Sequence, residues 1–116
     1  MPNLIRAISE NGGIVVCALD STGIIREMER IHKTSAVVSA ALGRLLTGAS
    51  LMGTWLKNSQ DSLTLRINGG GPIGTLLVVS DGEGNVRGYA DHPVTENVLR
   101  SDGKLAVGAA VGTDGT

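Results

Sequence analysis

The sequence has 116 residues, about the length of one domain, and with 41% hydrophobic and 18% charged residues it does not have the composition of a disordered chain. Ten basic residues against eleven acidic ones give a net charge of −1, and no basic cluster occurs, which argues against nucleic acid as a partner. Trp55 and Tyr89 are the only aromatic residues, so the core must be aliphatic and too few rings are present for bases to stack on.

The first twenty residues predict a β-hairpin. Two short apolar runs, 4–9 and 14–20, are separated by the polar segment 10–13, which contains an Asn-Gly pair. Both residues of such a pair tolerate the positive φ angles of a tight hairpin turn. Cys17, the single cysteine, lies in the second run and is expected to be buried in a strand. One cysteine forms neither an internal disulfide nor a zinc site by itself, which fits a reducing compartment.

Two helices are expected next. Isoleucine and methionine side chains recur at helical spacing between Ile24 and Ile31, after possible caps at 20–22, so a first helix should end near His32. A longer helix, capped by Thr34 or Ser35, should run to about residue 56. Three glycines lie inside it, and each costs about 1 kcal/mol relative to alanine. This predicts that another backbone approaches the helix closely. The glycines are Gly43, Gly48 and Gly53.

The long apolar helix approaches the length of a membrane span, but we expect it to belong to a soluble protein. Arg44 lies in its middle, and a central arginine costs about 2.5–3.5 kcal/mol on the insertion scale. The first thirteen residues lack the apolar stretch of a signal peptide. The apolar end of the helix, 52–56, could present a patch to another protein, but we interpret it as core.

The second half of the chain predicts a β-meander. Strands are expected at 63–67, 73–80 and 86–90, joined by glycine-rich turns. Apolar and polar residues alternate in the first of them, whereas the second carries apolar residues on both faces. After Asp91 the pattern weakens: 101–104 indicates a turn and 105–111 a short strand. The last residues, 112–116, have a turn signature with nothing after it, so we expect the sequence to be a fragment.

The expected fold class is α+β, a single domain over 1–116 with mostly antiparallel sheet layers packed by one long and one short helix. Segments 14–19 and 76–79 are apolar on both faces of their strands. Helices can cover one side of such a sheet. The other side requires a second sheet layer, giving β/β/α layering, or a second subunit, or sequence absent from this chain.

The glycine loop Gly69–Gly74 matches the dinucleotide fingerprint G-x-G-x-x-G. The fingerprint needs a helix after it to receive the pyrophosphate, whereas Pro72 interrupts this loop and a β-rich run follows. We interpret the loop as a hairpin turn. A small nucleotide-binding domain that uses the loop is the less favoured alternative, and it requires a helix directly after Gly74.

No metal site is predicted. Asp81, Glu83 and Asn85 resemble the start of a calcium loop, but Val86 stands where glycine is required and His92 where a bidentate glutamate belongs. A turn is the better interpretation.

No catalytic site is predicted either. His32 and His92 lie far apart in the sequence, without a neighbouring cysteine or histidine. Asp20, Ser21 and His32 lack the strand-to-helix turn on which a nucleophilic serine is presented. We therefore assign no catalytic, metal or cofactor-binding residue, and the residues that contact a substrate stay unknown.

Several segments together resemble the N-terminal domain of the heat shock protein 33 family, in matching order and spacing along the whole chain. These are Ser39-Ala40-Ala41-Leu42-Gly43-Arg44, Leu56-Lys57, Asn68-Gly69-Gly70-Gly71-Pro72-Ile73-Gly74, Val86-Arg87-Gly88-Tyr89 before Pro93, and Gly112-Thr113-Asp114-Gly115-Thr116. Each motif alone is ordinary, and the joint match is specific.

The resemblance implies a cytoplasmic, ATP-independent holdase that binds unfolding proteins under oxidative stress, forms dimers and is not an enzyme. The family's zinc lies in a C-terminal domain with four cysteines, and a linker covers a sheet surface when the chaperone is inactive. Cys17 matches none of those cysteines, so no metal or redox residue is carried over. Our hypothesis is that segment 76–79, lacking that cover, binds clients constitutively or self-associates. The alternative is a structural fragment with no activity of its own.

Overall fold

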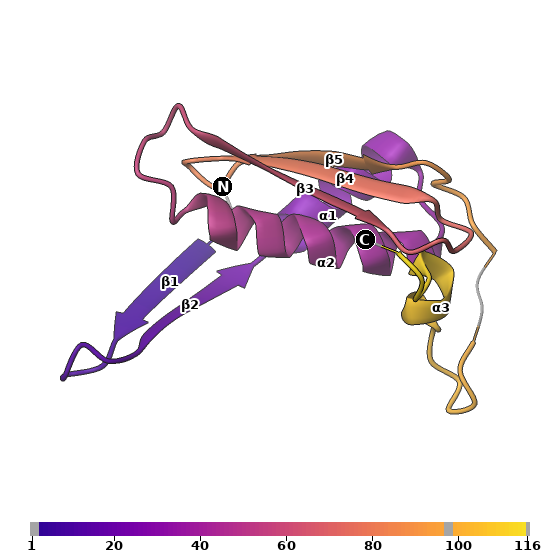
Figure 1. Cartoon of the computed structure of the whole chain (residues 1–116), viewed down its shortest axis with the longest axis horizontal. Helices are drawn as coiled ribbons and strands as arrows, with labels where there is room; N and C mark the ends of the chain where they lie inside the picture. The colour runs from indigo at the N-terminus through magenta and orange to yellow at the C-terminus, as the bar shows by residue number, and fades with distance from the viewer. Residues whose placement is uncertain (1–2, 97–98, 116) are drawn as a thin grey trace.

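The computed structural model describes residues 3–96 and 99–115. A three-stranded antiparallel sheet covers one side of a long helix, and a two-stranded hairpin projects from the body (Figure 1). The elements are β1 (Asn3–Ile8), β2 (Val15–Asp20), α1 (Thr22–His32), α2 (Ala36–Gly53), β3 (Ser62–Asn68), β4 (Thr75–Asp81), β5 (Val86–Ala90) and α3 (Val107–Val111). The expected α+β class, with antiparallel sheets packed by a long helix, is confirmed.

The predicted hairpin is confirmed, and local hydrogen bonds explain its turn. Strands β1 and β2 pair over six residues on each side. The Ser9 amide donates to the Ile14 carbonyl (2.9 Å), and the Asn11 side chain accepts from the Gly13 amide (2.9 Å). Gly12 has φ 71°, the left-handed conformation that the Asn-Gly pair indicated.

Helix α2 forms the centre of the core. Leu76, Val78 and Ala90 of the sheet point toward it and are buried. The aliphatic core expected from the composition is confirmed, and half of its buried members among the described residues lie on α2. The buried residues of α2 in this core are Val37, Val38, Ala41, Leu42, Leu46 and Ala49. By length and composition α2 passes as a membrane span, but half of it is buried against the rest of the protein, which is the pattern of a core helix.

Two of the three glycines in α2 lie where another part of the chain approaches the helix closely, as the helix-propensity cost of glycine predicted. A Cβ at Gly53 would overlap the Ser80 side chain and the Asp81 carbonyl oxygen, and one at Gly43 would lie 3.1 Å from Ile25. Gly48 has nothing within 4 Å of its Cβ position among the described residues. The helix therefore approaches β4 closely at its C-terminal end, and one side near Gly48 stays open.

The two ends of α2 differ in detail from the prediction. Ser35 does precede the helix, but its hydroxyl donates to the Thr95 carbonyl (2.8 Å) and accepts from the Thr95 amide (3.1 Å), so it caps no amide of the helix. The helix ends at Gly53, where the backbone meets β4. Trp55 beyond it is 62% exposed, so our interpretation of 52–56 as core is wrong for this residue.

The strand predicted at 105–111 is wrong. Residues Val107–Val111 form the short helix α3, and Leu105 only makes an isolated bridge to Leu99. Alanine is the best helix former, and three alanines occur within 105–111. Packing decides the rest, because Ala110 is fully buried in the core.

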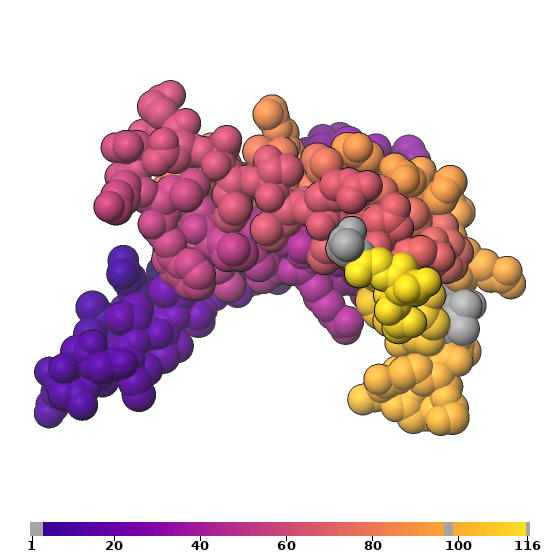
Figure 2. All heavy atoms as spheres, viewed as in Figure 1, coloured from indigo at the N-terminus to yellow at the C-terminus, as the bar shows by residue number. Residues whose placement is uncertain are grey.

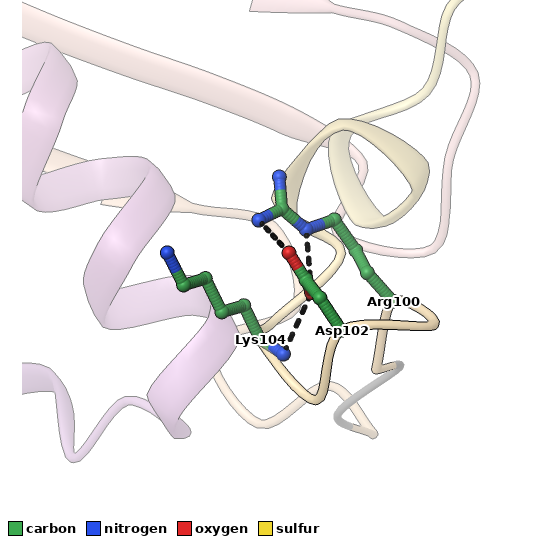
Figure 3. Close-up of polar contacts among 3 residues, drawn as sticks. All are labelled: Arg100, Asp102 and Lys104. Carbon is green, nitrogen blue, oxygen red and sulfur yellow. Dashed lines mark hydrogen bonds and ion pairs between the residues drawn. The ribbon is translucent and has the colours of Figure 1, made fainter.

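The turn predicted at 101–104 is confirmed. The Asp102 carboxylate accepts two hydrogen bonds from the Arg100 guanidinium (3.2 and 2.7 Å) and one from the Lys104 amide (3.1 Å) (Figure 3). Both side chains of the ion pair are about half exposed, so it adds at most about 1 kcal/mol. Local hydrogen bonds shape this loop.

The turn between β4 and β5 depends on an ionised aspartate, which predicts a pH effect. The Asp81 carboxylate accepts from the amides of Glu83 (2.9 Å) and Asn85 (3.1 Å), and these bonds, that from Glu83 first, hold the pKa of Asp81 below its usual value. A lowered folded-state pKa adds stability above the unfolded pKa of about 3.9, and this stability is lost as pH falls through the folded value. We expect the Glu83 and Asn85 amides to lose hydrogen-exchange protection below about pH 4.

Asp81→Asn is the matched control for this prediction, because it keeps the accepting oxygen and removes the titration. Its two amide protection factors should stay constant over the same pH range. An unchanged pH profile in the unsubstituted chain would contradict the role assigned to Asp81.

Candidate functional site

The hairpin β1–β2 exposes apolar side chains on both of its faces. Leu19 is partly buried, but the exposed fractions of the other large apolar residues run from 41% for Leu4 to 69% for Ile5. Strand alternation and register place Ile8 and Val15 on one face and Ile5 and Val16 on the other. An isolated two-stranded hairpin is only marginally stable in water, and contiguous exposed apolar surface marks an interaction site. This hairpin is the candidate functional site.

The space beside the hairpin is open. In Figure 2 the hairpin and the segment 99–105 project from the same side of the body, with a hollow between them. Helix α2 lies at this hollow in Figure 1, and a Cβ at Gly48 of this helix would have nothing within 4 Å among the described residues. A helix that is apolar all round is normally buried on every side. The hairpin and this side of α2 thus form one surface that another polypeptide layer can cover.

The sequence-based hypothesis placed the open surface at 76–79, and the structure shows that β2 is the more exposed of the two doubly apolar strands. Leu76 and Val78 of β4 are buried beneath α2, and Leu77 and Val79 on the other face are half-buried. The equally apolar β2 is the exposed one. Its signal was already present, because segment 14–19 is apolar on both faces, but the sequence does not say which of two such strands the helices cover.

The glycine loop holds another part of the same chain. The Gly71 amide donates to the Val111 carbonyl (3.0 Å), the Ile73 amide to the Ala110 carbonyl (3.1 Å), and the Asp114 amide to the Gly69 carbonyl (3.0 Å). Strand β4 begins at Thr75, where the nucleotide-binding alternative required a helix. That alternative is therefore wrong. The loop instead binds the segment 110–114 of the same chain through backbone hydrogen bonds.

The described residues do not fit a metal ion. Within 3–96 and 99–115, no three histidine, cysteine, aspartate or glutamate side chains come together as a possible metal site. Asp81 is used in its own turn, as the turn interpretation predicted. Cys17 is only partly buried on the hairpin, so the expected full burial is wrong, and among the described residues it belongs to no cluster of possible metal ligands.

An α+β fold that exposes contiguous apolar strand surface has the features of a domain with an interaction site. The Hsp33 protein family matches residues 3–116, and the chain belongs to this family. Its members are chaperones and not enzymes.

The curated relatives that the chain matches are named 33 kDa chaperonins. The 33 kDa chaperonin of Alkaliphilus metalliredigens is 48% identical over 112 residues, which cover 97% of this chain and 38% of that protein. The 33 kDa chaperonin of Bacillus licheniformis is 43% identical over 116 residues, covering 100% of this chain and 40% of the relative. The chain thus spans about two fifths of the length of these relatives.

A solved structure confirms the fold. The crystal structure of the 33 kDa chaperonin (heat shock protein 33 homolog) from Thermotoga maritima superposes with a TM-score of 0.87 at 30% identity. The match covers 94% of this chain and 37% of that one.

Proposed function

We propose that residues 1–116 are the N-terminal part of the core domain of a cytoplasmic, ATP-independent holdase. In this proposal the chain binds apolar segments of unfolding proteins without a redox switch. The exposed apolar hairpin carries the proposal, because Ile5, Ile14 and Val16 offer an unfolding client the kind of surface that folded proteins bury. Membership of a chaperone family supports it.

The zinc-dependent redox control of the family belongs, in this proposal, to sequence outside this chain. Cys17 is its only cysteine. Client binding should therefore be equal under reducing and oxidising conditions. The same apolar surface should also favour a homodimer in the absence of clients, since two hairpins can cover each other.

The matching experiment measures the light scattering of a thermally unfolding client enzyme under reducing conditions. Replacing two exposed hairpin residues, Ile5→Ser with Val16→Ser, should raise the chain concentration needed for half suppression about tenfold. Burying one such side chain fully contributes about 1.5–3 kcal/mol of binding free energy. We expect a client to cover each of the two only partly. Val94→Ser is the matched control, because Val94 is 75% exposed but lies outside the hairpin.

A second candidate function is a structural fragment that holds no clients. The open side of α2 at Gly48 favours it, since a covering layer from a longer chain would occupy the surface on which clients are proposed to bind. A folded chain that suppresses no aggregation at any concentration would support the structural fragment and contradict the holdase. Equal activity of the hairpin double variant and the unsubstituted chain would contradict the assignment of the hairpin as a client-binding surface.

A further inference from the structure

A second apolar groove lies between helix α1 and strand β5. It encloses about 550 Å³, within the usual range for binding sites. Ile24, Met28 and Ile31 form one wall, spaced four and three residues apart on the same side of α1. The other wall consists of the five consecutive residues 84–88. Residues 86–88 of this wall belong to β5, and because neighbouring residues of a strand point to opposite faces, three consecutive strand residues in one wall place the edge of the strand there.

The backbone of this edge has hydrogen-bonding capacity to spare. Strand β5 pairs with β4 and with no other described strand. The Asn85 carbonyl accepts from β4 (3.1 Å) and the Asp91 amide donates to β4 (2.9 Å), so odd-numbered residues direct their backbone toward β4. The even-numbered residues therefore direct their amides and carbonyls toward the open edge, and these make no hydrogen bond within the described part of the chain. They are Val86, Gly88 and Ala90.

The charge of the groove is negative. Asp20 and Glu27 both line it, but Glu27 is neutralised by its ion pair with Arg30. Asp20 has no cationic partner among the described residues, and hydrogen bonds from Thr22 hold the pKa of its carboxyl below the usual value, so it is ionised at neutral pH. Arg87 also lines the groove, and strand alternation places its exposed side chain on the face of the sheet opposite to Val86 and Gly88.

We propose that this groove binds an extended apolar segment that carries lysine or arginine, and that the segment adds to β5 as a further strand. Its backbone would pair with Val86 and Gly88, its apolar side chains would pack against Ile24 and Ile31, and its basic side chain would lie near Asp20. Strand addition supplies affinity through main-chain hydrogen bonds and selectivity through alternate side chains. The inference rests on the proposed holdase function and names a second contact for the same clients.

The test uses the whole chain and a fluorescein-labelled nine-residue peptide that alternates valine with lysine. Fluorescence anisotropy measures its affinity, and amide hydrogen exchange locates it. The amides of Val86, Gly88 and Ala90 should gain protection, while those of Arg87 and Tyr89, already bonded to β4, should change little. A peptide with proline at its centre lacks one amide donor and should bind about tenfold more weakly. Glutamate in place of lysine should weaken binding at least threefold.

Two variants separate the apolar wall from the charge. Ile31 is 55% exposed, so Ile31→Lys should leave the fold intact and weaken peptide binding about tenfold. Asp20→Asn keeps an oxygen that accepts from Thr22 and should abolish the preference for lysine over glutamate. Val94→Lys, at an exposed position that does not line the groove, should leave the affinity unchanged.

Four outcomes would overturn the proposal, and three of them concern the peptide: no peptide binding, protection on the hairpin in place of β5, or equal binding of the proline peptide. Loss of self-association in Ile31→Lys, measured by sedimentation, would assign the groove to a second copy of the chain and overturn it too. The holdase function is judged separately. Aggregation suppression without peptide binding would support the holdase function and contradict the groove as a peptide site. Peptide binding without suppression would support the groove and contradict the holdase function.

Discussion

Gly53→Ala is expected to destabilise the chain by about 1–3 kcal/mol, the usual cost of forcing extra volume into a packed contact. The added Cβ would overlap the Asp81 carbonyl oxygen, which belongs to the backbone of β4 and cannot turn aside as the Ser80 side chain can. The helix must move away from the sheet or the strand must bend. Urea denaturation followed by circular dichroism measures the effect, and the melting temperature should fall by at least about 4 °C.

Gly48→Ala is the matched control in the same helix. Its Cβ would have nothing within 4 Å among the described residues, so the change should raise stability by up to about 1 kcal/mol through helix propensity alone. Equal effects of the two substitutions would contradict the close contact between α2 and β4. A destabilising Gly48→Ala would instead place a further layer on the open side of α2, in this chain a second copy.

Gly71→Ala is expected to release the segment 110–114 from the glycine loop, again at a cost of about 1–3 kcal/mol. Its Cβ would lie 2.5 Å from the Ala110 carbonyl oxygen and 2.6 Å from the Val111 carbonyl carbon, both of which are backbone atoms. The hydrogen bonds that Ile73 and Asp114 donate across this contact should break together. Hydrogen exchange of those two amides measures the release.

Gly108→Ala controls for the glycine content of the same region. Gly108 lies in α3 with nothing within 4 Å of its Cβ position among the described residues, so alanine there should leave the amides of Ile73 and Asp114 protected or increase their protection. Retained protection of both amides in Gly71→Ala would show that the loop tolerates a side chain. It would contradict the close contact between the glycine loop and the segment 110–114.

Local elements were predictable from the sequence because their causes are local. The Asn-Gly turn of the hairpin, the helical spacing of Ile24 to Ile31 and the alternation in the meander each depend on neighbours within a few residues. The strand predicted in place of helix α3 was wrong because the segment 105–111 mixes alanine, a strong helix former, with glycine and the β-branched valine. The burial of Ala110 beneath the glycine loop, a contact distant in sequence, selects the helix.

The candidate site was only half predictable. The sequence indicated that 14–19 and 76–79 need cover on both faces, and the family resemblance indicated a chaperone. It did not indicate that α2 covers Leu76 and Val78 and leaves Ile5 and Val16 exposed. The groove beside β5 has no sequence signal, because it joins helix residues to strand residues about 60 positions later.

The sequence by itself determined the α+β class, the hairpin, the two longer helices, the three-stranded meander and the family. Each of these follows from periodicity, turn chemistry or motif order along the chain. Only the tertiary structure decided which apolar strand stays exposed, which glycines of α2 are needed, and what the glycine loop holds. All three depend on which surfaces of the chain come into contact. The sequence pattern of an apolar strand is the same whether or not another layer covers it.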